Sequence, residues 1–424
     1  EAEWAPDAVA EVVNQLTRAC PHVRVVLTSR IPLRLTGESL LSVAPLSTPP
    51  STDAGDLARW PAVRLLIDRL ADHAPDLVLS EDDIRRIAEI ARRVDGLPLA
   101  LEIVAGQAHS SSVPDLLAMV DLPLDLPAAE HDRAPRQRSL RDTLLWSVER
   151  LSPAARMVLG RLSVFAGTFE LSAAVAVAGA HHGTAAGRGA TDVPDVATVI
   201  RGLIREAHVQ VERRDGQLRL RLLRTVQSLA SELLEETGEV EEVRRRHREW
   251  FASRWRDRPL DDALIAEVAT SYADHVAALA NALEASDRST CGDLAIALSR
   301  YWFFVETGSA GLRWVRAVLA RDLVTPRQRA ILRMMTVALR PQDHGPDQRA
   351  ALDDLIAELA DDPDWLGRLH ILRSVGPYVH GDFARALACS RDAVAVARAR
   401  APHHLPEALG AYAVMLAALG RADE

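Results

Sequence analysis

Lysine is absent from this chain of 424 residues, so all 50 of its Lys+Arg side chains are arginine. A phosphate-binding loop of the G-x-x-x-x-G-K-[ST] type needs a lysine on the β- and γ-phosphates, and no such loop exists in this sequence. Schiff-base chemistry on lysine is excluded for the same reason. A nucleotide site built from these residues alone would therefore lack the phosphate-binding loop.

Cysteine is scarce as well. The three cysteines, Cys20, Cys291 and Cys389, are far apart and form no C-x-x-C pair. Neither a zinc ribbon nor a disulfide framework is predicted from this spacing. A reducing, cytoplasmic location is expected. H-E-x-x-H and G-x-S-x-G motifs are also missing, so we predict no metal site and no catalytic residues of a hydrolase.

Long apolar runs are missing too. No stretch approaches the ~20 residues of a membrane-spanning helix, and no signal peptide begins the chain. The formal charge of −9 leaves no overall basic field for nucleic acid. The sequence does not begin with methionine and opens in the middle of a structural unit, so we expect a fragment of a longer protein.

What the chain has in quantity is alanine, leucine, valine and arginine. Apolar residues make up 48% and aromatic residues only 4%. Alanine, leucine and arginine favour helices, so a mainly α fold is predicted. The length suggests about two to four domains.

The first 55 residues read as the end of an α/β subdomain. Residues 7–20 have apolar positions at helical spacing. Val23 to Leu27 is apolar at almost every position, which is typical of a buried strand in a parallel sheet. Thr28-Ser29-Arg30 follows directly. The predicted strand implies that the sheet continues before residue 1.

Residues 56–112 are predicted to be a small helical subdomain. Ser80 and Asp83 have the spacing of a capping box. Gly96 ends one helix and Pro98 begins the next. Residues 121–138 are rich in proline, aspartate and arginine, and we assign residues 113–138 to a linker.

Residues 139–256 are predicted to form a winged helix and a connecting helix. Short helices are followed by two extended runs around Asp215-Gly216, which is a hairpin signal. A long charged helix over 225–256 is expected to follow.

From residue 257 to 424 only helices are predicted. Gly308, Gly345, Gly381 and Gly420 are separated by 37, 36 and 39 residues, and a similar phrase follows each of the first three. The period is close to that of a tetratricopeptide helix pair, so we predict a TPR-like α-solenoid.

Several phrases occur in an order that is specific for one class of protein. Thr28-Ser29-Arg30 is followed by Asp95-Gly96-Leu97-Pro98-Leu99-Ala100, and then by the run from Ser139 to Gly167. In this order the chain resembles the NB-ARC type of STAND signal-transduction ATPases. More narrowly, it resembles the ATPase-and-repeat part of bacterial transcriptional regulators of the LuxR-like and SARP-like kinds. The resemblance extends over about residues 7–320.

The resemblance implies roles for particular residues. The arginine at the end of the sensor strand would face the γ-phosphate, because strand ends face the ligand in parallel sheets. The proline of the helical subdomain would pack on adenine. Alternatively, the first is a surface residue at a strand end and the second belongs to a structural turn. The nucleotide-binding residues implied in this way are Thr28, Ser29, Arg30, Gly96, Leu97 and Pro98.

A third position differs from the better-known relatives. They carry a Met-His-Asp trio whose histidine contacts the β-phosphate of ADP. Leu222-Leu223-Arg224 stands at this position. A histidine contact with ADP is therefore not expected, and Arg224 is a candidate phosphate contact.

As a whole, the resemblance implies the sensor, lid, winged-helix and repeat portion of an ATP/ADP-switched transcriptional regulator. ATP or ADP with Mg²⁺ would bind only if an N-terminal phosphate-loop subdomain is present. The intact relative would be a slow ATPase, and this chain alone would not be an enzyme. The repeats would bind a protein or small-molecule signal, oligomers are a further expectation, and a separate domain would bind DNA.

Two alternatives remain open from the residues. One is a stand-alone TPR-like scaffold for protein interactions. The other is a winged-helix DNA binder that uses the arginines between Arg201 and Arg224, together with those from Arg244 to Arg248. Glutamates are interleaved with these arginines, which favours a solvated, ion-paired face.

Overall fold

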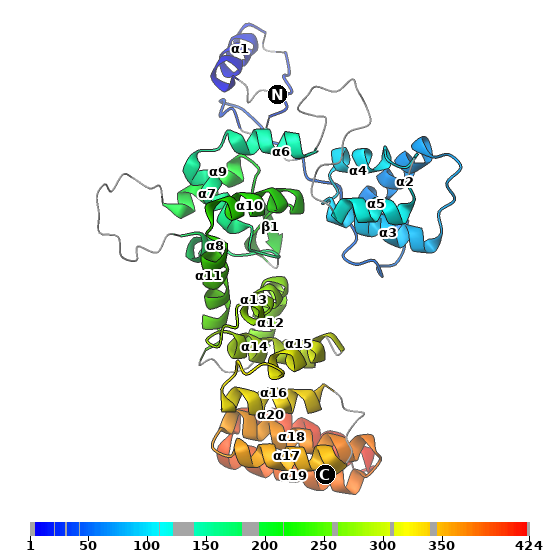
Figure 1. Ribbon diagram of the computed structural model, residues 1–424, viewed down its shortest axis with the longest axis vertical. Helices are drawn as coiled ribbons and strands as arrows, with labels where there is room; N and C mark the ends of the chain where they lie inside the picture. Colours follow the sequence, from blue (N-terminus) through cyan, green and yellow to red (C-terminus); the bar gives the residue numbers. More distant parts are fainter. Residues whose placement is uncertain are drawn as a thin grey trace, which may run out of the picture. The chain divides into compact units, whose positions relative to one another are not determined.

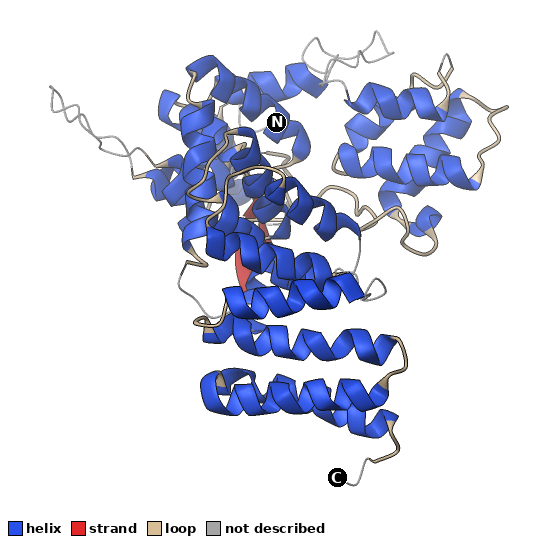
Figure 2. Ribbon diagram, turned by 60° about the horizontal axis from the view of Figure 1, so that its bottom comes forward, coloured by secondary structure: helices blue, strands red, loops and turns tan. Residues whose placement is uncertain are grey.

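The protein is mainly helical, which confirms the predicted fold class (Figures 1 and 2). In the described part of the chain, the only sheet has two strands. The chain divides into two compact units, residues 1–243 and 244–424. The computed structural model describes residues 5–20, 22–29, 32–41, 43–109, 111–121, 140–179, 195–214, 216–256, 262–305, 309–339 and 346–421.

The N-terminal segment begins with helix α1 (Pro6–Ala19), which has no buried residue. The strand predicted from Val23 to Leu27 is wrong. These residues form no strand, and Val26 is 92% exposed. A strand needs a neighbour to accept and donate its backbone hydrogen bonds. Within the described residues the only ladder is the later hairpin, so the segment has no partner strand.

Four helices then form a bundle, which we call the α2–α5 bundle (Figure 1). Its core contains apolar side chains from every helix, including Leu66, Ile87, Leu101 and Leu116. The predicted capping box is confirmed, because the Ser80 hydroxyl accepts a hydrogen bond from the backbone N–H of Asp83 at 3.2 Å. The elements are η2 (Leu57–Arg59), α2 (Pro61–His73), α3 (Glu81–Arg93), α4 (Pro98–Ala105) and α5 (Val113–Asp121).

Both ends of this bundle differ from the predicted boundaries. Leu46 and Ala54 pack against its core, so it begins before residue 56. The linker predicted over 113–138 starts later, because residues 113–121 form α5. Val113 and Leu116 are buried in the core, which explains why this short segment is ordered as a helix. Residues 122–138 of that linker lie outside the described part of the chain.

The next elements are helices followed by a β-hairpin, in the order predicted. Strand β1 pairs antiparallel with β2 in a register that places Val211 opposite Leu220. A single antiparallel bridge joins Phe169 to Leu220, so the segment before α8 pairs with β2 at one residue. Together we call these elements the hairpin unit: α6 (Leu140–Glu149), α7 (Pro153–Leu162), α8 (Leu171–Ala178), α9 (Val196–Arg205), β1 (Gln210–Arg214) and β2 (Gln217–Arg221).

The long helix predicted over 225–256 is two helices. Helix α10 (Arg224–Thr237) ends at Gly238, and α11 (Val240–Ser253) begins two residues later. Gly238 has a φ of 68°, a left-handed conformation that ends a helix and that glycine adopts without strain. The chain therefore changes direction here.

The second unit consists of successive helices. Helices α15, α17 and α19 begin one or two residues after positions 308, 345 and 381, so the glycine period marks helix pairs. Gly381 and Gly420 have positive φ at the ends of α18 and α20. Its elements are α12 (Asp262–Thr270), α13 (Tyr272–Glu284), α14 (Cys291–Phe304), α15 (Ser309–Leu319), α16 (Pro326–Ala338), α17 (Pro346–Glu358), α18 (Pro363–Val379), α19 (Phe383–Arg400), η5 (Pro402–His404) and α20 (Leu405–Ala418).

Candidate functional site

The turn between α3 and α4 is built around Gly96. Its φ is +63°, and a Cβ at this position would lie 2.1 Å from the carbonyl oxygen of Leu46. The backbone N–H of Leu46 in turn donates to the carbonyl of Gly96 at 3.0 Å. Only glycine fits a position with this conformation and this close a backbone neighbour. The predicted role of Gly96 as a helix end is therefore confirmed.

Leu97 and Pro98 continue the same turn. Pro98 is the first residue of α4, where its missing N–H costs nothing, and its ring is exposed. Leu97 is half-buried against the core of the α2–α5 bundle. The predicted start of a helix at Pro98 is confirmed. The turn presents a flat, exposed ring beside a rigid backbone.

Asp95, directly before this turn, contacts the helix that follows the hairpin. Its carboxylate accepts a hydrogen bond from the backbone N–H of Thr225 at 3.3 Å, and its side chain is buried. Helix α10 begins here with Leu223 as its cap residue, and leucine has no side-chain acceptor. A carboxylate is favourable at the N-terminus of a helix, so Asp95 supplies the cap that Leu223 lacks.

The electrostatics of Asp95 are dominated by burial. Burial raises its pKa to about 6, while the Arg221 guanidinium and the backbone N–H groups of Thr225 and Arg224 act in the lowering direction. Removal from water disfavours the ionised carboxylate more than these groups favour it. Asp95 also has a φ of 56°, a conformation for which aspartate and asparagine are enriched.

The structure brings some of the sequence-predicted residues together. Gly96, Leu97 and Pro98 lie next to Asp95, and Arg224 is the exposed first residue of α10, beside Thr225. Asp95 therefore links two segments to which the resemblance assigns nucleotide contacts. Asp95 belongs to the sequence motif that ends at Ala100, but the sequence alone indicated no role for it. The signal that points to it is a carboxylate next to a left-handed glycine.

The remaining predicted residues lie elsewhere or outside the described part. Thr28 and Ser29 are exposed on the extended segment 22–29 instead of ending a paired strand. Arg30 lies outside the described residues. No group of three or more histidine, cysteine or acidic side chains suited to a metal occurs among the described residues.

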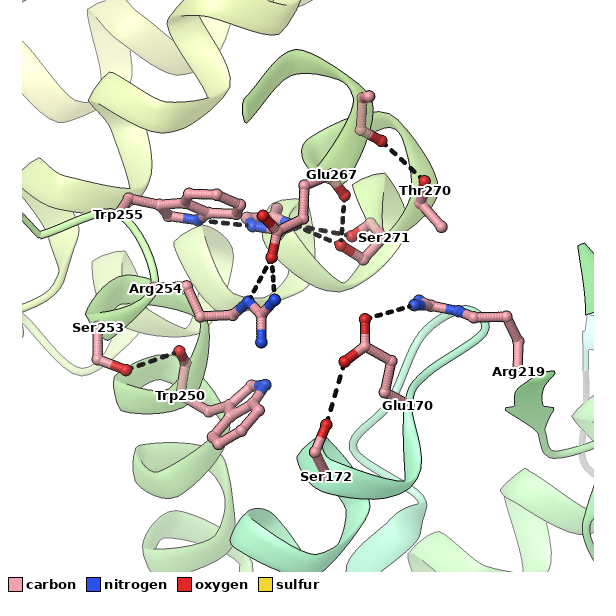
Figure 3. A network of polar contacts seen from close by, with 12 residues as sticks. Glu170, Ser172, Arg219, Trp250, Ser253, Arg254, Trp255, Glu267, Thr270 and Ser271 are labelled. Carbon is pink, nitrogen blue, oxygen red and sulfur yellow. Dashed lines mark hydrogen bonds and ion pairs between the residues drawn. The ribbon is translucent and has the colours of Figure 1, made fainter. Parts of the chain in front are cut away.

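Several arginines of the hairpin unit are paired with carboxylates. Arg161, which is buried, makes a two-pronged contact with Glu239 at 2.8 and 2.9 Å. Arg219 donates to Glu170 at 3.0 Å, as Figure 3 shows. The pairs Arg141–Glu232 and Arg221–Glu212 lie at 2.6 and 2.9 Å. These arginines hold helices and hairpin together, which favours the ion-paired face over phosphate contacts.

The second unit contains a buried polar cluster that the sequence did not indicate. Trp255 donates from Nε1 to Nε2 of His275 at 2.8 Å, and Nδ1 of His275 lies 2.9 Å from the carbonyl of Ser271 (Figure 3). These partners require a neutral ring with its proton on Nδ1. Beside it, Nε2 of His247 lies 3.3 Å from Asp274, and both side chains are fully buried.

The electrostatics of His275 follow from this burial. Desolvation lowers its pKa to about 4, although the Ser271 carbonyl and Asp274 act in the raising direction. A neutral imidazole between a tryptophan donor and a carbonyl acceptor is a structural hydrogen-bond bridge. It fastens the end of α11 to α13.

No protein-family profile matches this chain. It is 34% identical over 245 residues to an uncharacterised protein of Mycobacterium tuberculosis, a match that covers 57% of this chain and 58% of the relative. It is 30% identical over 319 residues to a predicted HTH-type transcriptional regulator of the same organism. That match covers 74% of this chain and 34% of the regulator, so the chain spans only part of the relatives that it resembles.

A structural likeness was found to a crystal structure of a STAND protein with a tetratricopeptide repeat sensor from Pyrococcus horikoshii. The TM-score is 0.26 with 11% identity, over 86% of this chain and 62% of that one. No helix among the described residues is long and apolar enough to cross a membrane.

Proposed function

We propose that this chain is the sensor, lid, winged-helix and repeat portion of a STAND-type transcriptional regulator that is switched by ATP and ADP. The hydrogen bond from Thr225 to Asp95 carries the proposal, because it joins the turn at Gly96 to the start of α10. The identity with a predicted transcriptional regulator over 319 residues supports the same class.

In this proposal the α2–α5 bundle is the lid and the hairpin unit is the winged helix. A nucleotide that packs on Pro98 moves the turn, and Asp95 moves with the turn. Since Asp95 caps α10, its displacement uncaps that helix and changes which arrangement of the hairpin unit is favoured. A ligand shifts such an equilibrium only by its difference in affinity for the two arrangements. The cap couples the arrangement of the turn to that of α10, so a nucleotide that prefers one position of the turn also favours one arrangement of the hairpin unit.

The chain holds only part of the nucleotide site. Arg30 and Arg224 would contact phosphate and Pro98 would contact the base. The amides at the start of α10 already have Asp95 as an acceptor, so they offer no phosphate cradle in this arrangement. A phosphate loop from outside these residues would hold ATP or ADP with Mg²⁺. We therefore propose that this chain alone hydrolyses no ATP and that a separate domain binds DNA in the cytoplasm.

The test is ADP binding by the complete protein that contains these residues, measured by isothermal titration calorimetry. Pro98→Ala is compared with Pro114→Ala, because both prolines are exposed in the first turn of a short helix. Arg224→Gln is compared with Arg391→Gln, which changes an exposed arginine far along the chain. We expect about tenfold weaker ADP binding for Arg224→Gln, the loss of one charge-assisted contact, and weaker binding for Pro98→Ala.

Unchanged ADP affinity in both site variants would overturn the assigned roles of Pro98 and Arg224. A complete protein that contains no phosphate loop and binds no ADP would instead support the scaffold function.

A further inference from the structure

We propose that a cavity in the helical repeats binds a small carboxylic acid with a short apolar chain. The inference rests on the proposed sensor role of the repeats and names the class of ligand sensed. The cavity has a volume of about 70 Å³. It is lined by eleven residues from four helices, α14, α16, α18 and α20.

The wall of the cavity is mostly apolar. Eight of the eleven lining residues are apolar, among them Phe303, Met334 and Trp365. Ligand sites typically combine such a wall with a few polar groups that fix the orientation of the ligand. Methionine side chains adapt readily to the shape of an apolar guest. The cavity is therefore suited to a hydrocarbon body.

Three charged residues, two of them arginines, interrupt the apolar lining of the cavity. Arg300 and Arg368 carry one positive charge each, and Glu407 carries one negative charge. A hydrogen bond with His404 lowers the pKa of Glu407, and the nearby Arg368 and Arg300 lower it further, so this carboxylate is ionised at neutral pH. A guanidinium group donates to a carboxylate with two parallel N–H groups, so two arginines in the lining favour a carboxylic acid as the ligand.

The position of Arg368 is set by an aromatic neighbour. Its guanidinium lies 5.2 Å from the ring centre of Trp365, within the range of a cation–π contact. This contact keeps the charged group at the apolar wall. A carboxylate that binds there places its hydrocarbon chain against the same wall.

The volume limits the size of the ligand. One water-sized group occupies roughly 10–15 Å³ on this measure, so the cavity holds about five such groups. Bonded atoms overlap and take up less room than separate water molecules, so a saturated carboxylic acid with about four to six carbon atoms fills it. In a solenoid each repeat contacts its neighbours only, so a ligand that touches α14, α16, α18 and α20 at once couples successive repeats.

The first experiment is calorimetric titration of the full chain with acetate, butyrate, hexanoate and octanoate, without nucleotide or DNA. Each added methylene should increase the affinity roughly threefold to fourfold until the cavity is full, and octanoate should gain little over hexanoate. Hexanol and hexylamine should bind at least tenfold more weakly than hexanoate. Equal binding of the three six-carbon ligands, or no saturable binding of hexanoate at ~10 mM, would overturn the proposal.

The second experiment locates the ligand in the unmodified protein. The chain has five methionines, so methyl-labelled methionine gives five NMR signals. Hexanoate should shift the signals of Met334 and Met335 and leave that of Met157, which lies in α7, unchanged. A shift at Met157 with none at Met334 and Met335 would place the ligand elsewhere and refute the site.

Variants then test the charge and the volume separately. Arg368→Gln should lower hexanoate affinity about tenfold and abolish the preference over hexanol, whereas Arg391→Gln on the exposed face of α19 should not. Ala338→Phe should fill the cavity and abolish binding. Saturation by an acidic peptide but not by hexanoate would overturn the small-molecule assignment. These assays contain no nucleotide, so their failure leaves the ADP test unaffected, and the reverse is also true.

Discussion

The carboxylate of Asp95 caps the helix that begins at Arg224, through a 3.3 Å hydrogen bond from the backbone N–H of Thr225 across 130 positions of sequence. The contact joins the end of α3 to the start of α10. Burial raises the pKa of Asp95 to about 6. At neutral pH the carboxylate is ionised although it is removed from water, which costs free energy in the folded state.

The first prediction concerns Asp95→Asn. The folded-state pKa of about 6 lies above the ordinary value of 3.8, so the stabilising contribution of Asp95 is present below pH ~4 and is lost as the pH rises through 6. Asparagine keeps the acceptor oxygen and tolerates the positive φ, but carries no charge. We expect the variant to be more stable than the natural protein by up to about 3 kcal/mol at pH 7.5 and by almost nothing at pH 4.

The measurement is urea unfolding at both pH values, followed by hydrogen exchange at the start of α10. Asp95→Ala serves as the control, because it removes the charge and the acceptor together and strains the backbone. It should be less stable than Asp95→Asn at both pH values. If the natural protein is more stable than Asp95→Asn at pH 7.5, the ionised carboxylate stabilises the fold and the prediction is wrong.

The second prediction concerns Gly96→Ala. A methyl group would lie 2.1 Å from the carbonyl oxygen of Leu46, at a φ of +63°. We expect a loss of about 2 kcal/mol or more in the unfolding free energy of the α2–α5 bundle. Gly410→Ala is the matched control, since nothing lies within 4 Å of its added Cβ inside α20. There alanine should stabilise by up to about 1 kcal/mol, and thermal melts of both variants check the contrast.

The third prediction concerns the acid sensitivity of the second unit. The folded-state pKa of His275 is about 4, below its ordinary value of 6.5. The unfolded chain therefore takes up a proton first, and stability is lost as the pH falls from 6.5 to 4. The expected loss from this residue is on the order of 3 kcal/mol, measured by hydrogen exchange of the α13 amides.

His275→Phe isolates this effect. It should weaken the unit at pH 7.5, because Trp255 loses its acceptor, but the fall between pH 6.5 and 4 should be smaller by about the same 3 kcal/mol. An unchanged pH profile would assign the acid sensitivity to other groups.

The fourth prediction concerns DNA. Because Arg219 and Arg221, two of the arginines that a DNA binder would use, are paired with Glu170 and Glu212, we expect no direct DNA binding by this chain at ~200 mM salt. A mobility-shift assay across a range of salt concentrations is the measurement. Binding that persists at ~200 mM salt would revive the winged-helix DNA binder as a function.

Local features were predictable because neighbouring residues determine them. The capping box at Ser80, the helix start at Pro98, the hairpin around Gly216 and the glycine period of the repeats all depend on short-range backbone chemistry. The predicted strand at Val23 to Leu27 failed for the opposite reason. A strand depends on a partner, and the described residues provide none for it.

By itself, the sequence determined that the chain is mainly helical, that it has no lysine to bind a phosphate group, and where several of its helices begin or end. Only the tertiary structure decided which distant groups meet: Asp95 with Thr225, Arg161 with Glu239, and the charged residues Arg300, Arg368 and Glu407 around one cavity. Capping and helix propensity act within a few residues, whereas burial and ion pairing depend on packing between segments far apart in the chain.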